Sequence, residues 1–335
     1  MTRRFSFSSW AHKNPWIWSA AAVVLVWFIL STATNRFNLS NLSGIVLSAS
    51  FLTVIGIAQM LVIATGRGNI DLSLPSIITL NAYVALIVIR GEDVNLPLGV
   101  GVAALIGLAV GGVNALLVVC LRIPAIIATL ATGYVLATAT LMANNYIPGF
   151  KVSPTLHYIA SARVAGIPVM VAVALALVGA TSFVLRRTLY GRKLSAVGQS
   201  RDAARLVGIH CGRIVASAFL LSALLASATG LLLGAYINGA FLEMGQTYLL
   251  QSVAAVVLGG TPIFGGAATS MGTFFASILL ILLVATMQVI GLPPGTQDMV
   301  QGVVVILVLA LAGAEAAGLR RTLPVRRPKG AARSA

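Results

Sequence analysis

Apolar runs long enough to cross a lipid bilayer occupy most of this 335-residue chain. A helix needs about 20 consecutive apolar residues to span the hydrocarbon core. Within the bilayer every backbone polar group must be satisfied inside the protein, so such runs fold as helices. We therefore predict an all-α polytopic membrane protein with about ten transmembrane helices, over residues 16–32, 42–64, 72–89, 96–121, 123–143, 166–185, 214–237, 248–263, 270–290 and 299–317.

The composition excludes a soluble protein. Charged residues make up 9% of the chain and hydrophobic residues 59%, whereas soluble domains are typically about 25% charged. The net charge of +15 does not indicate nucleic acid as a partner, because the basic residues lie between apolar runs and are not clustered with stacking aromatics.

The basic residues predict the topology. If the N-terminus is cytoplasmic and the spans alternate, 18 of the 22 Lys and Arg residues face the cytoplasm, as the positive-inside rule requires. Ten spans then leave both termini cytoplasmic. We expect a cytoplasmic N-terminal segment at 1–15, a transmembrane domain at 16–318 with a cytoplasmic loop at 186–213, and a basic, disordered cytoplasmic tail at 319–335.

Within the 186–213 loop the sequence predicts one short helix. Ser200 is a good N-cap, Asp202 falls in the first turn, and Gly208 suits a left-handed C-terminal position. The helix, at about residues 201–207, has roughly two turns and is too short to be stable alone in water. It must therefore dock, either on a protein partner or, as an amphipathic helix, among lipid headgroups.

Two Gly- and Pro-rich polar stretches, 66–75 and 258–266, interrupt the apolar runs at corresponding places in the two halves of the chain. Paired interruptions are typical of discontinuous helices near the centre of a transporter, where unwound backbone lines the substrate path. Asp71 in the first stretch has two interpretations. It lines or gates the path with Asn69 and Ser73, or it caps the third span.

Motifs for nucleotide binding, catalysis and metal binding are absent from the sequence. It contains no P-loop motif for nucleotide, no metalloprotease motif and no nucleophile elbow, and His12, His157 and His210 are far apart. Cys120 and Cys211 are isolated, which supports neither a disulfide framework nor a zinc site. We expect no catalytic residue, no metal and no cofactor bound by this chain, and therefore not an enzyme.

Five segments together resemble the permease subunit of bacterial ABC importers of the ribose/xylose/arabinose type. They occur in the family's order over about residues 40–315: 69–73, 123–130, 190–192 with 196–198, 203–209, and 254–261 with 265–266. The resemblance implies a multi-pass protein of the bacterial inner membrane that moves a monosaccharide (a pentose, hexose or similar sugar) into the cell.

The resemblance also implies the partners and the residue roles. A separate cytoplasmic ATPase hydrolyses ATP, a periplasmic sugar-binding protein delivers the sugar, and a second permease subunit, identical or paralogous, completes the path in the bilayer. The 200–208 coupling helix docks on the ATPase, with Ala203 and Ala204 permitting close approach and Leu206 filling an apolar pocket. The ATPase-coupling residues are Asp202, Ala203, Ala204, Arg205, Leu206 and Gly208. The substrate-path residues are Asn69, Asp71, Ser73, Thr129, Gly259, Gly260 and Thr261.

Two alternatives remain open at this point. A permease for branched-chain amino acids shares the same architecture. A stand-alone ion-coupled secondary carrier belongs to another class, and the absence of Asp, Glu and His from the span interiors argues against it. The sequence departs from the family pattern at Gly68-Asn69 and Ala125-Ile126, near the expected path, so the particular sugar is not specified.

Overall fold

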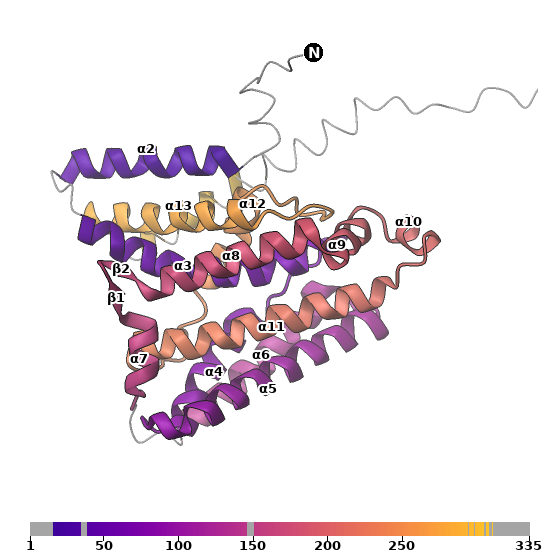
Figure 1. Ribbon diagram of the computed structural model, residues 1–335, viewed down its shortest axis with the longest axis horizontal. Helices are drawn as coiled ribbons and strands as arrows, with labels where there is room; N and C mark the ends of the chain where they lie inside the picture. Colours follow the sequence, from indigo (N-terminus) through magenta and orange to yellow (C-terminus); the bar gives the residue numbers. More distant parts are fainter. Residues whose placement is uncertain are drawn as a thin grey trace, which may run out of the picture.

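The computed structural model describes residues 16–34, 39–145, 151–293, 295–297, 299–304, 306–307 and 310. The predicted segments at 1–15 and 319–335 and much of the tenth span lie outside the described residues. The long helices run side by side, with α9 and α10 at one end and α7 with the β1–β2 hairpin at the other (Figure 1).

Helices occupy nine of the ten predicted spans, and the described residues of the tenth, 299–317, are also helical. They are α2 (Trp16–Thr34), α3 (Leu39–Ala64), α4 (Leu74–Ile89), α5 (Leu96–Ala115) continued by a π-helical turn η2 (Leu116–Cys120), α6 (Ala125–Asn144), α8 (Val169–Arg187), α11 (Cys211–Tyr236), α12 (Tyr248–Leu258) and α13 (Ser270–Val289). Six of the described helices are long and apolar enough to cross a membrane. This confirms an all-α polytopic membrane protein.

Helix α3 forms the centre of the bundle. In its most apolar stretch 83% of the residues are buried in the protein, against 28% to 33% in α5, α6 and α8. The outer helices instead expose large hydrophobic side chains, such as Leu105, Val135 and Phe183, which are 64% to 69% exposed. An apolar surface of this extent is expected where helices face lipid.

Small residues set the closest helix contacts, as the four-residue spacings Gly107/Gly111 and Gly230/Gly234 predict. A Cβ on Gly107 of α5 would overlap the Ser227 hydroxyl of α11, and a Cβ on Gly230 of α11 would overlap the Ile78 carbonyl oxygen of α4. Helix α11 therefore packs closely against both α5 and α4.

The two predicted interruptions are present. Helix α4 begins only at Leu74, and α12 ends at Leu258 before α13 starts at Ser270. With 16 and 11 residues, α4 and α12 are about 24 and 16 Å long, shorter than the hydrocarbon core of about 30 Å. Each short helix adjoins one of the two interruptions.

Four glycines bring the two interruptions together, and we call this contact the glycine junction: Gly66, Gly198, Gly265 and Gly266. The Gly266 amide donates to the Ala64 carbonyl oxygen at 3.2 Å, which joins the second interruption to the end of α3. A Cβ on Gly198 would overlap that same carbonyl oxygen and the Gly266 amide nitrogen. Only glycine permits backbones to approach this closely.

Gly198 belongs to α9 (Leu189–Gln199), a helix that the sequence analysis missed. Polar and basic side chains alternate in it with apolar ones, so the segment resembles a polar loop, but Leu194 and Val197 are buried on one face. The Thr188 hydroxyl caps it by accepting from the Gly191 amide at 3.4 Å. The 186–213 loop therefore contains two helices and not one.

The predicted short helix follows as α10 (Arg201–Leu206). The Ser200 hydroxyl accepts from the Ala203 amide at 3.3 Å, Asp202 lies in the first turn, and Gly208 has a left-handed φ of +79°. The Gly208 amide donates to the Arg205 carbonyl oxygen at 3.0 Å. Both predicted caps are confirmed.

At the opposite end, the segment between α6 and α8 folds as α7 (Pro154–Ser161) and a hairpin of β1 (Arg163–Val164) and β2 (Ile167–Pro168), with Arg163 paired to Pro168. A 3-10 turn η1 (Asp93–Asn95) holds α7 in place, because the Asp93 carboxylate accepts from the Thr155 amide at 3.1 Å and from its hydroxyl at 2.7 Å.

We predict that Gly230→Ala destabilises the bundle. The added methyl group must displace the α4 backbone, and overpacking of this kind costs about 1–3 kcal/mol. The matched control is Gly112→Ala on α5, where a Cβ meets nothing within 4 Å. The midpoint of thermal unfolding in detergent should fall for Gly230→Ala only. Equal midpoints for the two variants would refute this tight contact.

Candidate functional site

A cluster of polar side chains is buried where the first interruption meets α4. The Asp71 carboxylate oxygen Oδ1 accepts from the Ser73 amide at 3.0 Å and from the Ser73 hydroxyl at 2.6 Å. The Asn114 side-chain amide, from α5, donates to the same hydroxyl at 2.8 Å. These contacts tie α5 to the start of α4.

Thr129 and Gln59 attach two more helices to this cluster. The Thr129 hydroxyl of α6 accepts from the Leu72 amide at 2.9 Å. With its amide oriented to satisfy both groups, the buried Gln59 of α3 donates to the Asp71 carbonyl oxygen at 3.1 Å and accepts from the Asp71 amide at 3.2 Å. Side chains from neighbouring helices thus satisfy the unwound backbone, which a membrane interior requires.

The two carboxylate oxygens of Asp71 have different surroundings. Its Oδ1 atom accepts from the Ser73 amide, one of the free N–H groups at the start of α4, so Asp71 acts as a cap. Its Oδ2 atom is buried and has no hydrogen-bond partner among the described residues. Because a buried unpaired carboxylate oxygen is costly, this second atom is available for a polar ligand or a water molecule.

The predicted path residues separate into two groups. Asp71, Ser73 and Thr129 belong to the cluster above, and Asn69 lies beside it, donating to the Thr65 hydroxyl at 2.8 Å. Gly259, Gly260 and Thr261 lie instead at the second interruption. There the Thr269 hydroxyl donates to the Gly259 carbonyl oxygen at 2.6 Å, and the Thr269 amide donates to the Thr261 hydroxyl at 3.2 Å.

Four of the predicted path residues are buried. Asp71, Ser73, Thr129 and Thr261 are each no more than 2% exposed. Among the predicted path residues, Asn69 alone lines the cavity described next.

Sequence reasoning missed the amides that complete this polar interior. Asn81 on α4 donates to the Ser227 hydroxyl of α11 at 3.1 Å, and Asn114 and Gln59 hold the cluster itself. The available signal was an amide inside an apolar run of membrane length, whereas the sequence analysis searched the spans only for ionisable groups.

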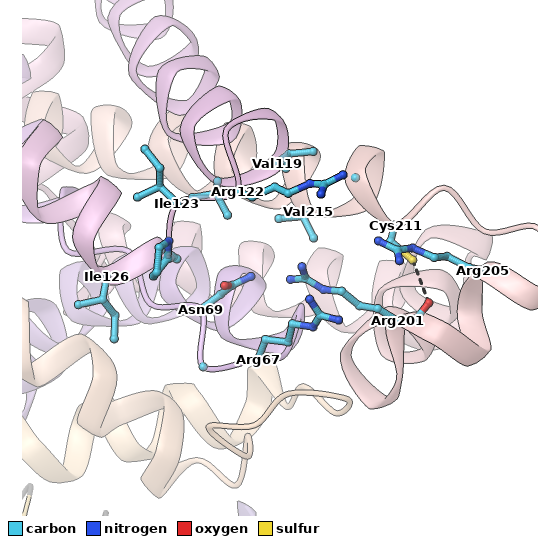
Figure 2. Close-up of a pocket in the computed structure, with 15 residues that line it drawn as sticks. Arg67, Asn69, Val119, Arg122, Ile123, Ile126, Arg201, Arg205, Cys211 and Val215 are labelled. Carbon is cyan, nitrogen blue, oxygen red and sulfur yellow. Dashed lines mark hydrogen bonds between the residues drawn. The ribbon is translucent and has the colours of Figure 1, made fainter.

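A cavity of about 530 Å³ opens at the α10 end of the molecule, between the first interruption, the α5–α6 connection and the start of α11 (Figure 2). We call it the arginine pocket, after four of its lining residues: Arg67, Arg122, Arg201 and Arg205. None of the described residues that line it is acidic.

The tip of α10 is exposed and apolar. Leu206 and Val207 are 88% and 74% exposed, and Ala203 is exposed beside them. Ala204 differs from the prediction, because it is 2% exposed and packs inward with Val197 and Cys211. It fixes α10 to its own chain and offers no surface to a partner in this conformation. The residues presented outward are Asp202, Ala203, Arg205 and Leu206.

Comparison with known proteins identifies relatives along most of the chain. A family described as "Branched-chain amino acid transport system / permease component" matches residues 41–309. The ribose import permease protein RbsC of Escherichia coli (strain K12) is 31% identical over 309 residues, which cover 91% of this chain and 95% of that protein.

Two further relatives are similar over comparable lengths. The autoinducer 2 import system permease protein LsrC of Enterobacter sp. (strain 638) is 32% identical over 88% of this chain and 86% of its own length. A probable ABC transporter permease protein, y4mJ of Sinorhizobium fredii (strain NBRC 101917 / NGR234), is 29% identical over 90% of both chains. No solved structure matches the chain.

The family match spans both interruptions, the polar cluster and α9–α10, and six of the described helices suit a multi-pass protein of the inner membrane. The chain belongs to the family of branched-chain amino acid transport system permease components.

Proposed function

We propose that this chain is the membrane subunit of an ATP-driven importer of a small sugar. A separate cytoplasmic ATPase that docks on α10 supplies the energy by hydrolysing ATP. The observation that carries the proposal is the exposed apolar tip of α10, Leu206 and Val207, on a short helix capped at both ends. An exposed apolar tip on a rigid support is typical of a residue that anchors a protein–protein contact.

A route for force from α10 to the interior supports the same function. Helix α10 follows directly on α9, and Gly198 of α9 touches the backbones of both interruptions at the glycine junction. The first interruption continues within a few residues to Asp71 and Ser73. A displacement of α9–α10 by the ATPase would therefore reach the polar cluster through backbone contacts, without long, flexible side chains between them.

The polar cluster suits a neutral polyhydroxyl substrate better than an amino acid. Most of its side chains are hydroxyls and amides, which pair with sugar hydroxyls, and Ser73 already occupies one oxygen of its one carboxylate, Oδ1 of Asp71. An amino acid would bring an ammonium and a carboxylate group, and burying both requires charged partners. The relatives named for ribose and autoinducer 2 import agree with this choice over branched-chain amino acids.

The remaining parts of the assembly follow from the same proposal. A periplasmic binding protein delivers the sugar, and a second permease, identical or paralogous, faces this one. The chain crosses the membrane about ten times with both termini in the cytoplasm. The basic residues at the α9–α10 end support this orientation, since Arg186, Arg187, Arg192 and Lys193 all lie there.

We predict that uptake of a radiolabelled pentose into proteoliposomes requires both the partner ATPase and ATP. The chain has no nucleotide-binding motif, and its described span interiors hold no relay of acids for an ion gradient. The control vesicles contain an ion gradient and no ATPase. Uptake driven by that gradient alone would identify a secondary carrier, and competition by leucine in place of pentose would identify an amino acid permease.

We predict that Leu206→Glu abolishes co-purification of the ATPase. A carboxylate at the apolar tip would have to be buried without a partner, which costs several kcal/mol and suffices to lower affinity more than 100-fold. The matched control is Val94→Glu, which alters an equally exposed apolar residue, also 88% exposed, at the opposite end of the molecule. Normal recovery of the ATPase with Leu206→Glu would eliminate α10 as the docking element.

We predict that Gly198→Ala uncouples transport while leaving docking intact. The methyl group must separate α9 from the interruptions, so ATPase binding at α10 no longer moves the polar cluster. Uptake should fall at least ten-fold with unchanged ATPase co-purification. Gly179→Ala on α8, where a Cβ meets nothing within 4 Å, is the control. Full uptake with Gly198→Ala would show that force takes another route.

A further inference from the structure

The arginine pocket gathers more positive charge than the described protein compensates. Arg67 comes from the first interruption, Arg122 from the α5–α6 connection, and Arg201 and Arg205 from α10. Figure 2 shows the guanidinium ends of Arg67 and Arg201 pointing into the opening, with Arg122 across from them. The one ion pair among the described residues, Arg205 to Asp202 at 3.8 Å, lies on the exposed surface of α10.

Arg201 carries the strongest sign of a missing partner. Its Nε and Nη2 atoms are buried, and neither has a hydrogen-bond partner among the described residues. Burial, followed by repulsion from Arg67, lowers the pKa of Arg201. A guanidinium group does not lose its proton in a protein, so the charge persists and requires an anion or water.

Two of the other arginines that line the pocket have an unusual backbone conformation. Arg67 and Arg122 have left-handed φ angles of 61° and 58°, a conformation that is unfavourable for a residue with a Cβ. Cys211 and Gly212 also line the pocket, so the positive end of the 26-residue α11 dipole faces it. Several fixed sources of positive potential thus converge on one cavity.

We propose that the arginine pocket is a cytoplasmic binding site for a phosphate ester. Arginines on separate elements can surround a phosphate dianion with charge-assisted, bidentate hydrogen bonds. The volume of about 530 Å³ exceeds what inorganic phosphate needs and falls in the range of small-molecule sites. Val119, Ile126 and Val215 form an apolar wall, and Asn69 adds an amide for the organic part of the ligand.

The location gives the ligand a consequence for transport. One wall of the pocket is α10, and another is Arg67 to Asn69 in the first interruption. A bound phosphate ester would hold these two elements at a fixed separation. It would thus act on the same coupling route from the cytoplasmic side, without entering the substrate path.

Isothermal titration calorimetry of the full chain in lipid nanodiscs tests the proposal. The probes are inorganic phosphate, glucose 6-phosphate and glucose, at constant ionic strength set with chloride. We expect saturable binding of glucose 6-phosphate, weaker binding of inorganic phosphate and none of glucose. Binding should weaken as pH falls through about 6, where a phosphate monoester loses its second charge.

Single-residue variants distinguish binding at a specific site from nonspecific attraction to positive charge. Arg201→Gln and Arg122→Gln, on different elements, should each weaken glucose 6-phosphate binding at least ten-fold, so the result does not depend on the folding of α10. Arg213→Gln, which alters an exposed arginine outside the pocket, should leave affinity unchanged. Equal losses in all three variants, or full competition by chloride, would overturn the proposal.

Two further arms identify the source of the phosphate group. Nanodiscs of phosphatidylcholine alone are compared with nanodiscs containing phosphatidylglycerol. If the anionic lipid blocks glucose 6-phosphate binding in an Arg201-dependent manner, a lipid headgroup fills the site. If it does not, the ligand is a soluble ester. If no phosphate binds and Arg201→Gln instead reduces ATPase co-purification, the arginines serve a protein carboxylate and the proposal is overturned.

Discussion

The fold depends on satisfying unwound backbone inside a bilayer. A continuous helix bonds its own amides and carbonyls, but α4 begins after one interruption and α12 ends before the other, leaving free groups at those ends. The protein satisfies them in two ways. Side chains from α3, α5 and α6 bond to Asp71, Leu72 and Ser73, and glycines let backbones contact one another directly at the glycine junction. These contacts set the positions of the surrounding helices.

This constraint also joins parts of the molecule that the sequence keeps apart. Residues 66, 198 and 265 lie in separate segments, yet their backbones meet because none carries a side chain. Helix α9, which leads directly into α10, is thereby in contact with both interruptions. In the proposed function, packed backbone spans the distance between an ATPase docked on α10 and the polar cluster, and it is a stiff medium for transmitting a small displacement.

Much of the architecture was predictable because its causes are local. Apolar runs predict spans, Gly and Pro predict the interruptions, and Ser200, Asp202 and Gly208 predict the caps of α10. Helix α9 escaped prediction because its buried face holds only Leu194, Val197 and a glycine, which the surrounding polar residues conceal. The inward position of Ala204 and the partners of Asn114 arise from tertiary packing, and no local pattern of residues encodes them. The sequence analysis used the four arginines of the arginine pocket only as separate signals of topology. Only the folded structure shows that they line one cavity.

The two caps of α10 have a consequence for the cost of each transport cycle. If the ATPase docks on α10 as proposed, a loop that folded only on contact would lose part of its binding free energy to ordering the chain at each engagement. The Ser200 hydroxyl and the left-handed Gly208 hold these two turns in shape beforehand. A modest contact area then suffices for recognition, and dissociation stays fast because the affinity need not be high. A prefolded tip of this kind suits the proposed contact with an ATPase, which must dissociate as often as it binds.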